Sequence, residues 1–303
     1  MNAPKHRLSA VDVTLELGSR PLLMGIVNAS PDSFSDGGMH AGLEAQLALA
    51  RELHEAGADI LDIGGESAST GRPPVAEQEE IERVLPLIER VARELGALVS
   101  VDTYKPAVAS AAIAAGAKIV NDVSGLRDPA LAEVCARSGA ALVVMHTRAA
   151  PRERLQDPDL YGDIVTEVMD FLAAGMARAI AAGCRPEQIL LDPGPDFAKT
   201  PAQTIRLLRE LERLHGLGRP LLLAISRKDF IGALTRRGPR ERLAGTLAAL
   251  AYGVERGAHI FRLHDVAAAA DFLTVRAALT GDGEPGRDLA VGEEQRYDRL
   301  LAD

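Results

Sequence analysis

The chain lacks any stretch approaching the ~18 consecutive apolar residues of a membrane-spanning helix. Positive charge is also in short supply, because 34 Lys and Arg against 43 Asp and Glu give a formal net charge of −9. This balance argues against nucleic acid as a partner, since phosphate backbones are bound by clustered Lys and Arg. The first residues lack the apolar core of a secretory signal. We therefore expect a cytoplasmic protein without a membrane partner.

Cysteine is scarce as well, with two residues in the chain, Cys135 and Cys184. Both fall in segments predicted to be helical, and neither has a cysteine or histidine at metal-ligand spacing. We interpret them as small buried apolar residues of a protein in a reducing compartment.

A short pattern recurs along the chain of 303 residues. Gly and Ala are followed by an apolar run and then by a polar residue, as in AGADILDIGG from Ala56, AGAKIVNDVSG from Ala115 and RGAHIFRLHD from Arg256. Glycine commonly ends a helix because it adopts positive φ without a Cβ clash. The apolar run lacks the alternation of a half-exposed strand. Such continuous apolar runs are typical of strands in a parallel sheet that helices cover.

Five such repeats and three further runs, Leu22–Val27, Ile189–Leu191 and Leu221–Ile225, predict eight strands separated by amphipathic helices. This alternation predicts an α/β fold, a single (β/α)8 TIM barrel over residues 21–280. Residues 1–20 are expected to form a cap below it and 281–303 a polar tail. A doubly wound open sheet is the alternative, but it usually has fewer strands and would carry GxGxxG or GxxxxGK[ST], and both are absent.

Polar residues follow the predicted strands at their C-terminal ends, where a TIM barrel places its active site. They are Asn28, Asp62, Asp102, Asn121, His146, Asp192, Lys228, Arg262 and His264. Any single one can be a cap or turn residue, and Asp62 and His146 are the most readily explained in that way. The whole set is not so explained, because charges at a partly buried rim cost desolvation energy unless something pairs with them.

The set divides by chemistry. Acceptors and an amide that suit a heterocycle with N–H and amino donors come from the middle strands, on Asp102, Asn121 and Asp192. A cationic corner that suits phosphate comes from the first and last strands, on Asn28, Arg262 and His264. No Ser–His–Asp, Cys–His or metal-type carboxylate–histidine group can be placed, so stabilisation of a charged leaving group is favoured over nucleophilic catalysis.

Longer motifs resemble the dihydropteroate synthase family over nearly the whole chain, from about Pro21 to Leu279. In the family's order they are MGIVNASPDSFSDGG, DIGGES, SVDTYKPAVA, AGAKIVNDVSG, VVMHT, LLDPGPDFAKT, AISRKDFIG and GAHIFRLHDV. The resemblance implies a TIM-barrel transferase of folate biosynthesis, usually a homodimer and a target of sulfonamides. Such an enzyme condenses hydroxymethyl-dihydropterin pyrophosphate with p-aminobenzoate and releases pyrophosphate with the assistance of Mg²⁺.

The resemblance also implies the roles of individual residues. The pterin would be bound by Asp102, Asn121, Met145, Asp192, Phe197 and Lys228. The pyrophosphate would be bound by Asn28, Arg262 and His264, with Asn28 beside the magnesium ion. The implied catalytic residues are Asp102, Asp192, Lys228 and Arg262.

Two loops depart from the family pattern on the acceptor side. After GGES the family continues Thr-Arg-Pro-Gly, whereas this chain reads ASTGRPP, which displaces the expected pair to Thr70 and Arg72. The glycine-rich DPGxGFGK loop reads DPGPDFAK here, with Pro195, Asp196 and Ala198 making it stiffer and more acidic.

A third departure is Asp229, which follows Lys228 where many members have Ser near the carboxylate of p-aminobenzoate. At ~4 Å two carboxylates repel by about 4 kcal/mol with an effective dielectric of 20, or about 1 kcal/mol in water. The alternative is that Asp229 caps the following helix and points away from the site.

Three functions follow from these observations. The first is a working dihydropteroate synthase with a variant acceptor side and a reduced response to sulfonamides. The second is a paralogue that binds the pterin pyrophosphate without catalysis or with another acceptor. The third is a corrinoid-type pterin-binding methyltransferase, against which the cationic corner argues because a methyl-folate donor carries no pyrophosphate.

Overall fold

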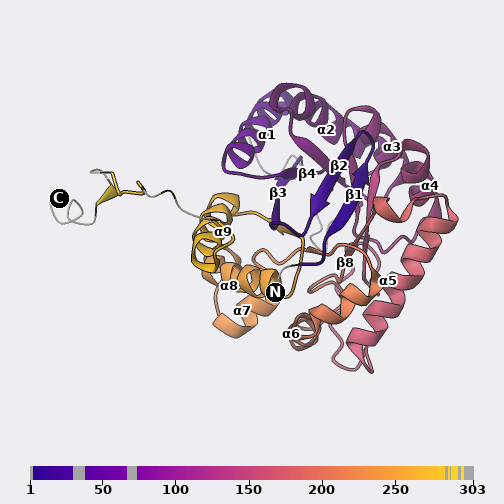
Figure 1. Ribbon diagram of the computed structural model, residues 1–303. Coiled ribbons are helices and arrows are strands. Elements are labelled where there is room, and N and C mark those ends of the chain that lie inside the picture. Colours follow the sequence, from indigo (N-terminus) through magenta and orange to yellow (C-terminus); the bar gives the residue numbers. More distant parts are fainter. Residues whose placement is uncertain are drawn as a thin grey trace.

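The computed structural model describes residues 3–29, 38–66 and 74–283, with 286, 288–292, 295 and 296 beyond them. Within these ranges, eight parallel strands form the barrel (Figure 1). They are β3 (Leu22–Asn28), β4 (Ile60–Gly64), β5 (Leu98–Asp102), β6 (Ile119–Asp122), β7 (Ala141–Met145), β8 (Ile189–Asp192), β9 (Leu222–Leu223) and β10 (Ile260–Leu263). The order β8-β7-β6-β5-β4-β3-β10-β9 is closed by a parallel bridge between Leu191 and Leu221. The predicted TIM barrel is confirmed.

Helices surround the strands. They are α1 (Gly38–Glu55), α2 (Glu77–Arg90), α3 (Pro106–Ala114), α4 (Pro129–Ser138), α5 (Ile164–Ala181), α6 (Pro201–Arg209), α7 (Asp229–Thr235), α8 (Leu243–Glu255) and α9 (Val266–Thr280). Two begin with a side-chain cap followed by proline, because Asp128 accepts from the N–H of Ala130 and Thr200 accepts from the N–H of Gln203. None of the described helices is long and apolar enough to cross a membrane.

The N-terminal segment forms an antiparallel hairpin of β1 (His6–Ala10) and β2 (Val13–Leu17). Its Leu8 and Leu17 are buried in the same apolar cluster as Ile60 and Ile260, which begin their barrel strands. The hairpin therefore covers the N-terminal end of the barrel and leaves the opposite end for the site (Figure 1).

The two cysteines are buried free thiols. Cys135 lies in α4, but the prediction that Cys184 is helical is wrong. α5 ends at Ala181, and Gly183 turns the chain at φ +103° before Cys184 is reached. Glycine is the residue that adopts this conformation with least strain.

Candidate active site

The strand register brings the predicted site residues to one rim of the barrel. Gly64 pairs with both Asn28 and Asp102, and Asp102 pairs with Asn121 on the next strand. On the other side of the rim Met145 pairs with Asp192. Asn121, Met145 and Asp192 are buried, Asp102 is half-buried, and Asn28 is exposed at the end of β3.

A hydrogen-bond network joins the acceptor residues to the arginine of the cationic corner. Asp62 Oδ2 accepts from Arg262 Nε at 2.6 Å and from Asn121 Nδ2 at 3.0 Å. A second nitrogen of Arg262 donates to Asp102 Oδ2 at 2.7 Å. The interpretation of Asp62 as a cap or turn residue is wrong, because it is fully buried and its charge is paired with Arg262.

Burial shifts the ionisation of two carboxyl groups on the rim. Burial raises the pKa of Asp102 to about 7, although the charge of Arg262 opposes the shift. Burial also raises the pKa of Asp192 to about 6, against a 2.7 Å hydrogen bond that Gly194 N–H donates to its Oδ1. When ionised, the carboxyl groups of Asp102 and Asp192 only accept hydrogen bonds, and when protonated each can also donate one. This property suits a heterocyclic ligand that exchanges protons.

His264 lies just beyond β10 and completes the corner with Asn28 and Arg262, since β10 and β3 are paired neighbours. The Oγ of Ser226 lies 2.9 Å from His264 Nδ1 and also accepts from the His264 backbone N–H at 3.1 Å. Ser226 therefore orients the imidazole of His264.

Lys228 and Phe197 lie together in the loops that follow β9 and β8. The ammonium of Lys228 is 4.3 Å from the centroid of the Phe197 ring, which is a cation–π distance. Burial lowers the pKa of Lys228, and the carboxylates of Asp196 and Asp192 oppose this. The ammonium of Lys228 therefore lies near the carboxylates of Asp192 and Asp196.

A buried lysine within the DPGPDFAK loop, Lys199, holds the loop through hydrogen bonds. Lys199 Nζ lies 2.8 Å from His146 Nδ1, 2.8 Å from the carbonyl oxygen of Gly194 and 3.0 Å from that of Phe197. Burial lowers the pKa of Lys199 to about 7. His146 is therefore a buried partner of this loop, and its interpretation as a cap or turn residue is wrong.

Two residues of this loop replace family glycines at positions that need a left-handed backbone. Asp196 has φ +64° and Ala198 has φ +50°. Such conformations cost an L-residue roughly 1–2 kcal/mol, which is why glycine suits them. Asp196 offsets part of this cost, because its carboxylate accepts from Thr204 Oγ1 at 2.9 Å and from the N–H of Phe230 at 3.3 Å.

Asp229 is the first residue of α7, and Lys228 occupies the N-cap position. The alternative in which Asp229 caps the helix is wrong, because the N–H groups of Ile231 and Gly232 donate to the carbonyl oxygen of Lys228. Asp229 is 52% exposed, lines the cavity described next and pairs with Arg242 at 3.1 Å.

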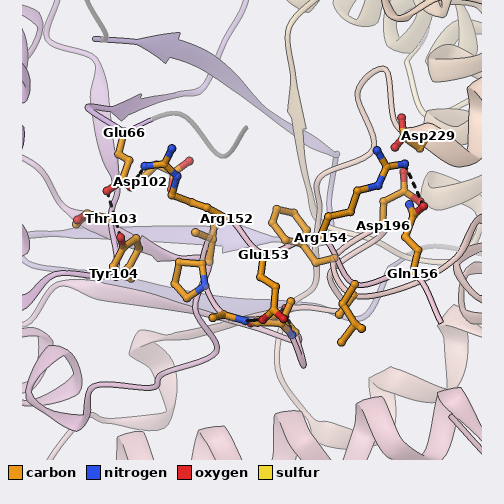
Figure 2. A pocket seen from close by; sticks show the side chains of 18 of the residues that line it. Glu66, Asp102, Thr103, Tyr104, Arg152, Glu153, Arg154, Gln156, Asp196 and Asp229 are labelled. Atoms are coloured by element: carbon orange, nitrogen blue, oxygen red, sulfur yellow. Dashed lines mark hydrogen bonds and ion pairs between the residues drawn. The ribbon is translucent and has the colours of Figure 1, made fainter. Parts of the chain in front are cut away.

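A cavity of about 270 Å³ lies along this rim (Figure 2). Asp102 and Thr103 line one part of it, Phe197 and Asp229 another, and the loop Pro151–Gln156 a third. Thr70, Arg72 and most of the MGIVNASPDSFSDGG loop, residues 30–37, lie outside the described residues.

A cluster of buried charges on the cavity wall was not predicted from the sequence. Lys105 Nζ donates to Glu66 Oε2 at 2.6 Å and to Glu80 Oε2 at 2.5 Å, while Arg152 donates to Glu66 Oε1 at 2.7 Å. None of these four side chains is more than 10% exposed. The charged residues inside DIGGES and SVDTYKPAVA were the available signal.

Comparison with known proteins identifies the family. A family model described as pterin binding enzyme matches residues 24–264. The dihydropteroate synthase of Bacillus subtilis is 42% identical over 270 residues, which cover 89% of this chain and 92% of the relative. The chain belongs to the dihydropteroate synthase family. It is therefore a transferase of folate biosynthesis, which decides against the corrinoid-type methyltransferase.

Solved structures agree with this assignment. A Xanthomonas albilineans dihydropteroate synthase with 4-aminobenzoic acid superposes with a TM-score of 0.84 and is 44% identical, covering 91% of this chain and 99% of the other. The same bacterium's enzyme in complex with 7,8-dihydropteroate gives a TM-score of 0.80 at 43% identity, with coverages of 90% and 98%. The sequence-based resemblance is confirmed.

Proposed function

We propose that this protein condenses 6-hydroxymethyl-7,8-dihydropterin pyrophosphate with p-aminobenzoate to form dihydropteroate and pyrophosphate. The observation that carries the proposal is the network in which Arg262 bonds Asp62 and Asp102, while Asn121 donates to the same Asp62 carboxylate. The 4-aminobenzoic acid and 7,8-dihydropteroate named with the Xanthomonas relatives support the acceptor and the product.

In this proposal the buried rim binds the pterin. Asn121 and Asp192 address the N–H and amino groups of the heterocycle, and the apolar Met145 packs against it. Asp102 lies beside the reacting methylene, whose developing positive charge a carboxylate stabilises. Phe197 and Lys228 cover the ring from the loop side.

The cationic corner binds the leaving pyrophosphate. Arg262 bonds Asp62 and Asp102 through Nε and one terminal nitrogen, and its remaining N–H groups can donate to phosphate oxygens. Asn28 and His264 add single hydrogen bonds. The effect on rate comes from stabilising charge that grows as the C–O bond breaks, before the aromatic amine attacks the methylene carbon.

We also propose that Mg²⁺ assists, bound beside Asn28. The described residues contain no group of three or more His, Cys, Asp or Glu side chains placed to hold a metal, and Asn28 offers one exposed amide oxygen. This donor set fits Mg²⁺, which keeps several waters and is commonly held through substrate phosphates and one or two protein oxygens. When bound, the ion would neutralise charge on the pyrophosphate.

The oligomeric state and location complete the proposal. Exposed apolar side chains on neighbouring helices α7, α8 and α9 suit a second copy of the chain in a cytoplasmic homodimer. They are Leu234, Leu243, Val275 and Leu279, which are 67%, 37%, 59% and 83% exposed. Light scattering that gives a monomer mass at micromolar concentration would contradict the dimer.

A second candidate is a paralogue that uses another acceptor or does not catalyse, and the observation that favours it is Asp229 on the cavity wall. One experiment separates the two. Pyrophosphate release from the pterin substrate with Mg²⁺ is measured with and without p-aminobenzoate, and the product is identified by mass. Release that requires p-aminobenzoate supports the synthase, whereas pterin binding without such release supports the paralogue.

A further inference from the structure

The part of the cavity that would receive the acceptor is rich in negative charge. Asp196 and Asp229 both line it, and Arg242 pairs with Asp229. An acceptor with a carboxylate, as the proposed function requires, needs a cation there that offsets these charges. Lys228 is already placed over the ring of Phe197.

Arg154 supplies a further cation on the cavity wall. It belongs to the loop between β7 and α5, and its side chain extends toward the part of the wall formed by Asp196 and Asp229 (Figure 2). Its guanidinium donates to Gln156 Oε1 at 3.1 Å. It forms no ion pair within the described ranges. A guanidinium carries five N–H donors, so most of its hydrogen-bonding capacity remains for a ligand.

The loop is held so that Arg154 faces the cavity. Arg152, two residues earlier, has φ +69° and donates to Glu66 at 2.7 Å, and these two side chains are 9% and 6% exposed. Figure 2 shows Arg152 directed to Glu66 and Arg154 directed to the opposite part of the cavity. The buried ion pair therefore fixes the loop from which Arg154 extends.

We propose that Arg154 binds the carboxylate of the aromatic-amine acceptor and gives the site its preference for anionic acceptors over neutral ones. This inference rests on the proposed function. A guanidinium binds a carboxylate through two parallel hydrogen bonds. Arg154 would do so on the same cavity wall where Asp229 would repel that carboxylate. Arg154 thus compensates for the aspartate that this chain carries at the start of α7.

The test compares two acceptors that differ in charge, p-aminobenzoate and p-aminobenzamide, at saturating pterin pyrophosphate. In Arg154→Gln we expect KM for p-aminobenzoate to rise about two- to fivefold, as for a solvent-accessible charge pair, with KM for p-aminobenzamide nearly unchanged. KM for the pterin stays at the wild-type value. Arg154→Lys keeps the charge but loses the planar fork of donors. We expect its KM for p-aminobenzoate to lie between the values of wild type and Arg154→Gln.

Arg127→Gln is the matched control, because it removes an exposed arginine of the β6–α4 loop that does not line the cavity. It should leave both KM values unchanged. An Arg154→Gln effect that is equal for the two acceptors, or no effect on either, overturns the proposal. If the wild-type protein forms no dihydropteroate, the proposed function fails, and the same contrast is then measured by calorimetric titration of each acceptor onto the pterin complex.

Discussion

The two sides of the barrel mouth are built from different parts of the fold. The pterin side consists of residues on the barrel strands, Asp62, Asp102, Asn121 and Asp192, and Arg262 bonds the first two of them. The acceptor side consists of loop and helix-start residues, Arg154, Asp196 and Asp229. A strand end is held by the sheet on both edges, whereas a loop changes its residues at lower cost. This difference explains why the departures from the family pattern gather on the acceptor side.

The largest effect is expected on the pterin side, from Arg262→Met. This substitution leaves two carboxylates in a buried site without their shared partner, which costs about 3–5 kcal/mol. It also removes stabilisation of the leaving group, and we expect kcat to fall by about 10²- to 10³-fold. Urea unfolding and steady-state kinetics measure the two effects. Arg262→Lys keeps the charge and should lose less stability and less activity. An unfolding free energy of Arg262→Met within about 1 kcal/mol of wild type would contradict the role of Arg262 as the shared partner of two buried carboxylates.

The next effect concerns pH. The pKa of Asp102 is raised to about 7 in the folded protein from an ordinary 3.8, so the folded state holds this proton more tightly than the unfolded chain. The contribution of Asp102 to stability is therefore highest below pH ~4 and falls as pH rises toward 7. Relative to Asp102→Asn, wild type should lose at least about 1 kcal/mol of unfolding free energy over this window. If urea titrations give a difference in unfolding free energy between wild type and Asp102→Asn that is constant from about pH 4 to 8, this prediction is wrong.

A smaller effect is expected on the acceptor side, from Asp229→Ser. Removing a solvent-accessible like charge should lower KM for p-aminobenzoate about two- to fivefold, because such charges interact by about 1 kcal/mol or less. Inhibition by sulfonamides should strengthen in the same proportion, since a reduced response in the wild-type protein is our expectation. Asp229→Asn serves as the control of equal size, and an unchanged KM in both variants would separate Asp229 from the acceptor.

The smallest effect is expected within the DPGPDFAK loop. Ala198→Gly relieves a left-handed alanine at a cost in backbone entropy, so we expect a gain of up to about 1 kcal/mol in unfolding free energy. Asp196→Gly should bring no such gain, because it loses the bonds to Thr204 and Phe230. Thermal unfolding of the two variants side by side tests the contrast, and equal stabilisation by both would remove the anchoring role of Asp196.

Much of the fold was predictable from the sequence because its signals are local. Apolar runs preceded by glycine marked the strands, and capping residues followed by proline marked the starts of α4 and α6. Cys184 shows the limit of such signals, since the end of α5 depends on where Gly183 turns the chain. The strand-end position of the site residues was predictable for the same reason, because order along the chain sets order around the barrel.

What only the tertiary structure decided is which of these side chains meet. Arg262 bonds Asp62 and Asp102 across 200 and 160 positions of sequence, and Arg152 bonds Glu66 across 86. Local patterns carry no information about such pairs, because they form only when the barrel closes and β10 comes to lie beside β3. The sequence by itself determined the barrel and the residues on its rim. Closure of the barrel determined that the rim arginine bridges two carboxylates, and that a loop arginine extends into the cavity where an acceptor would lie.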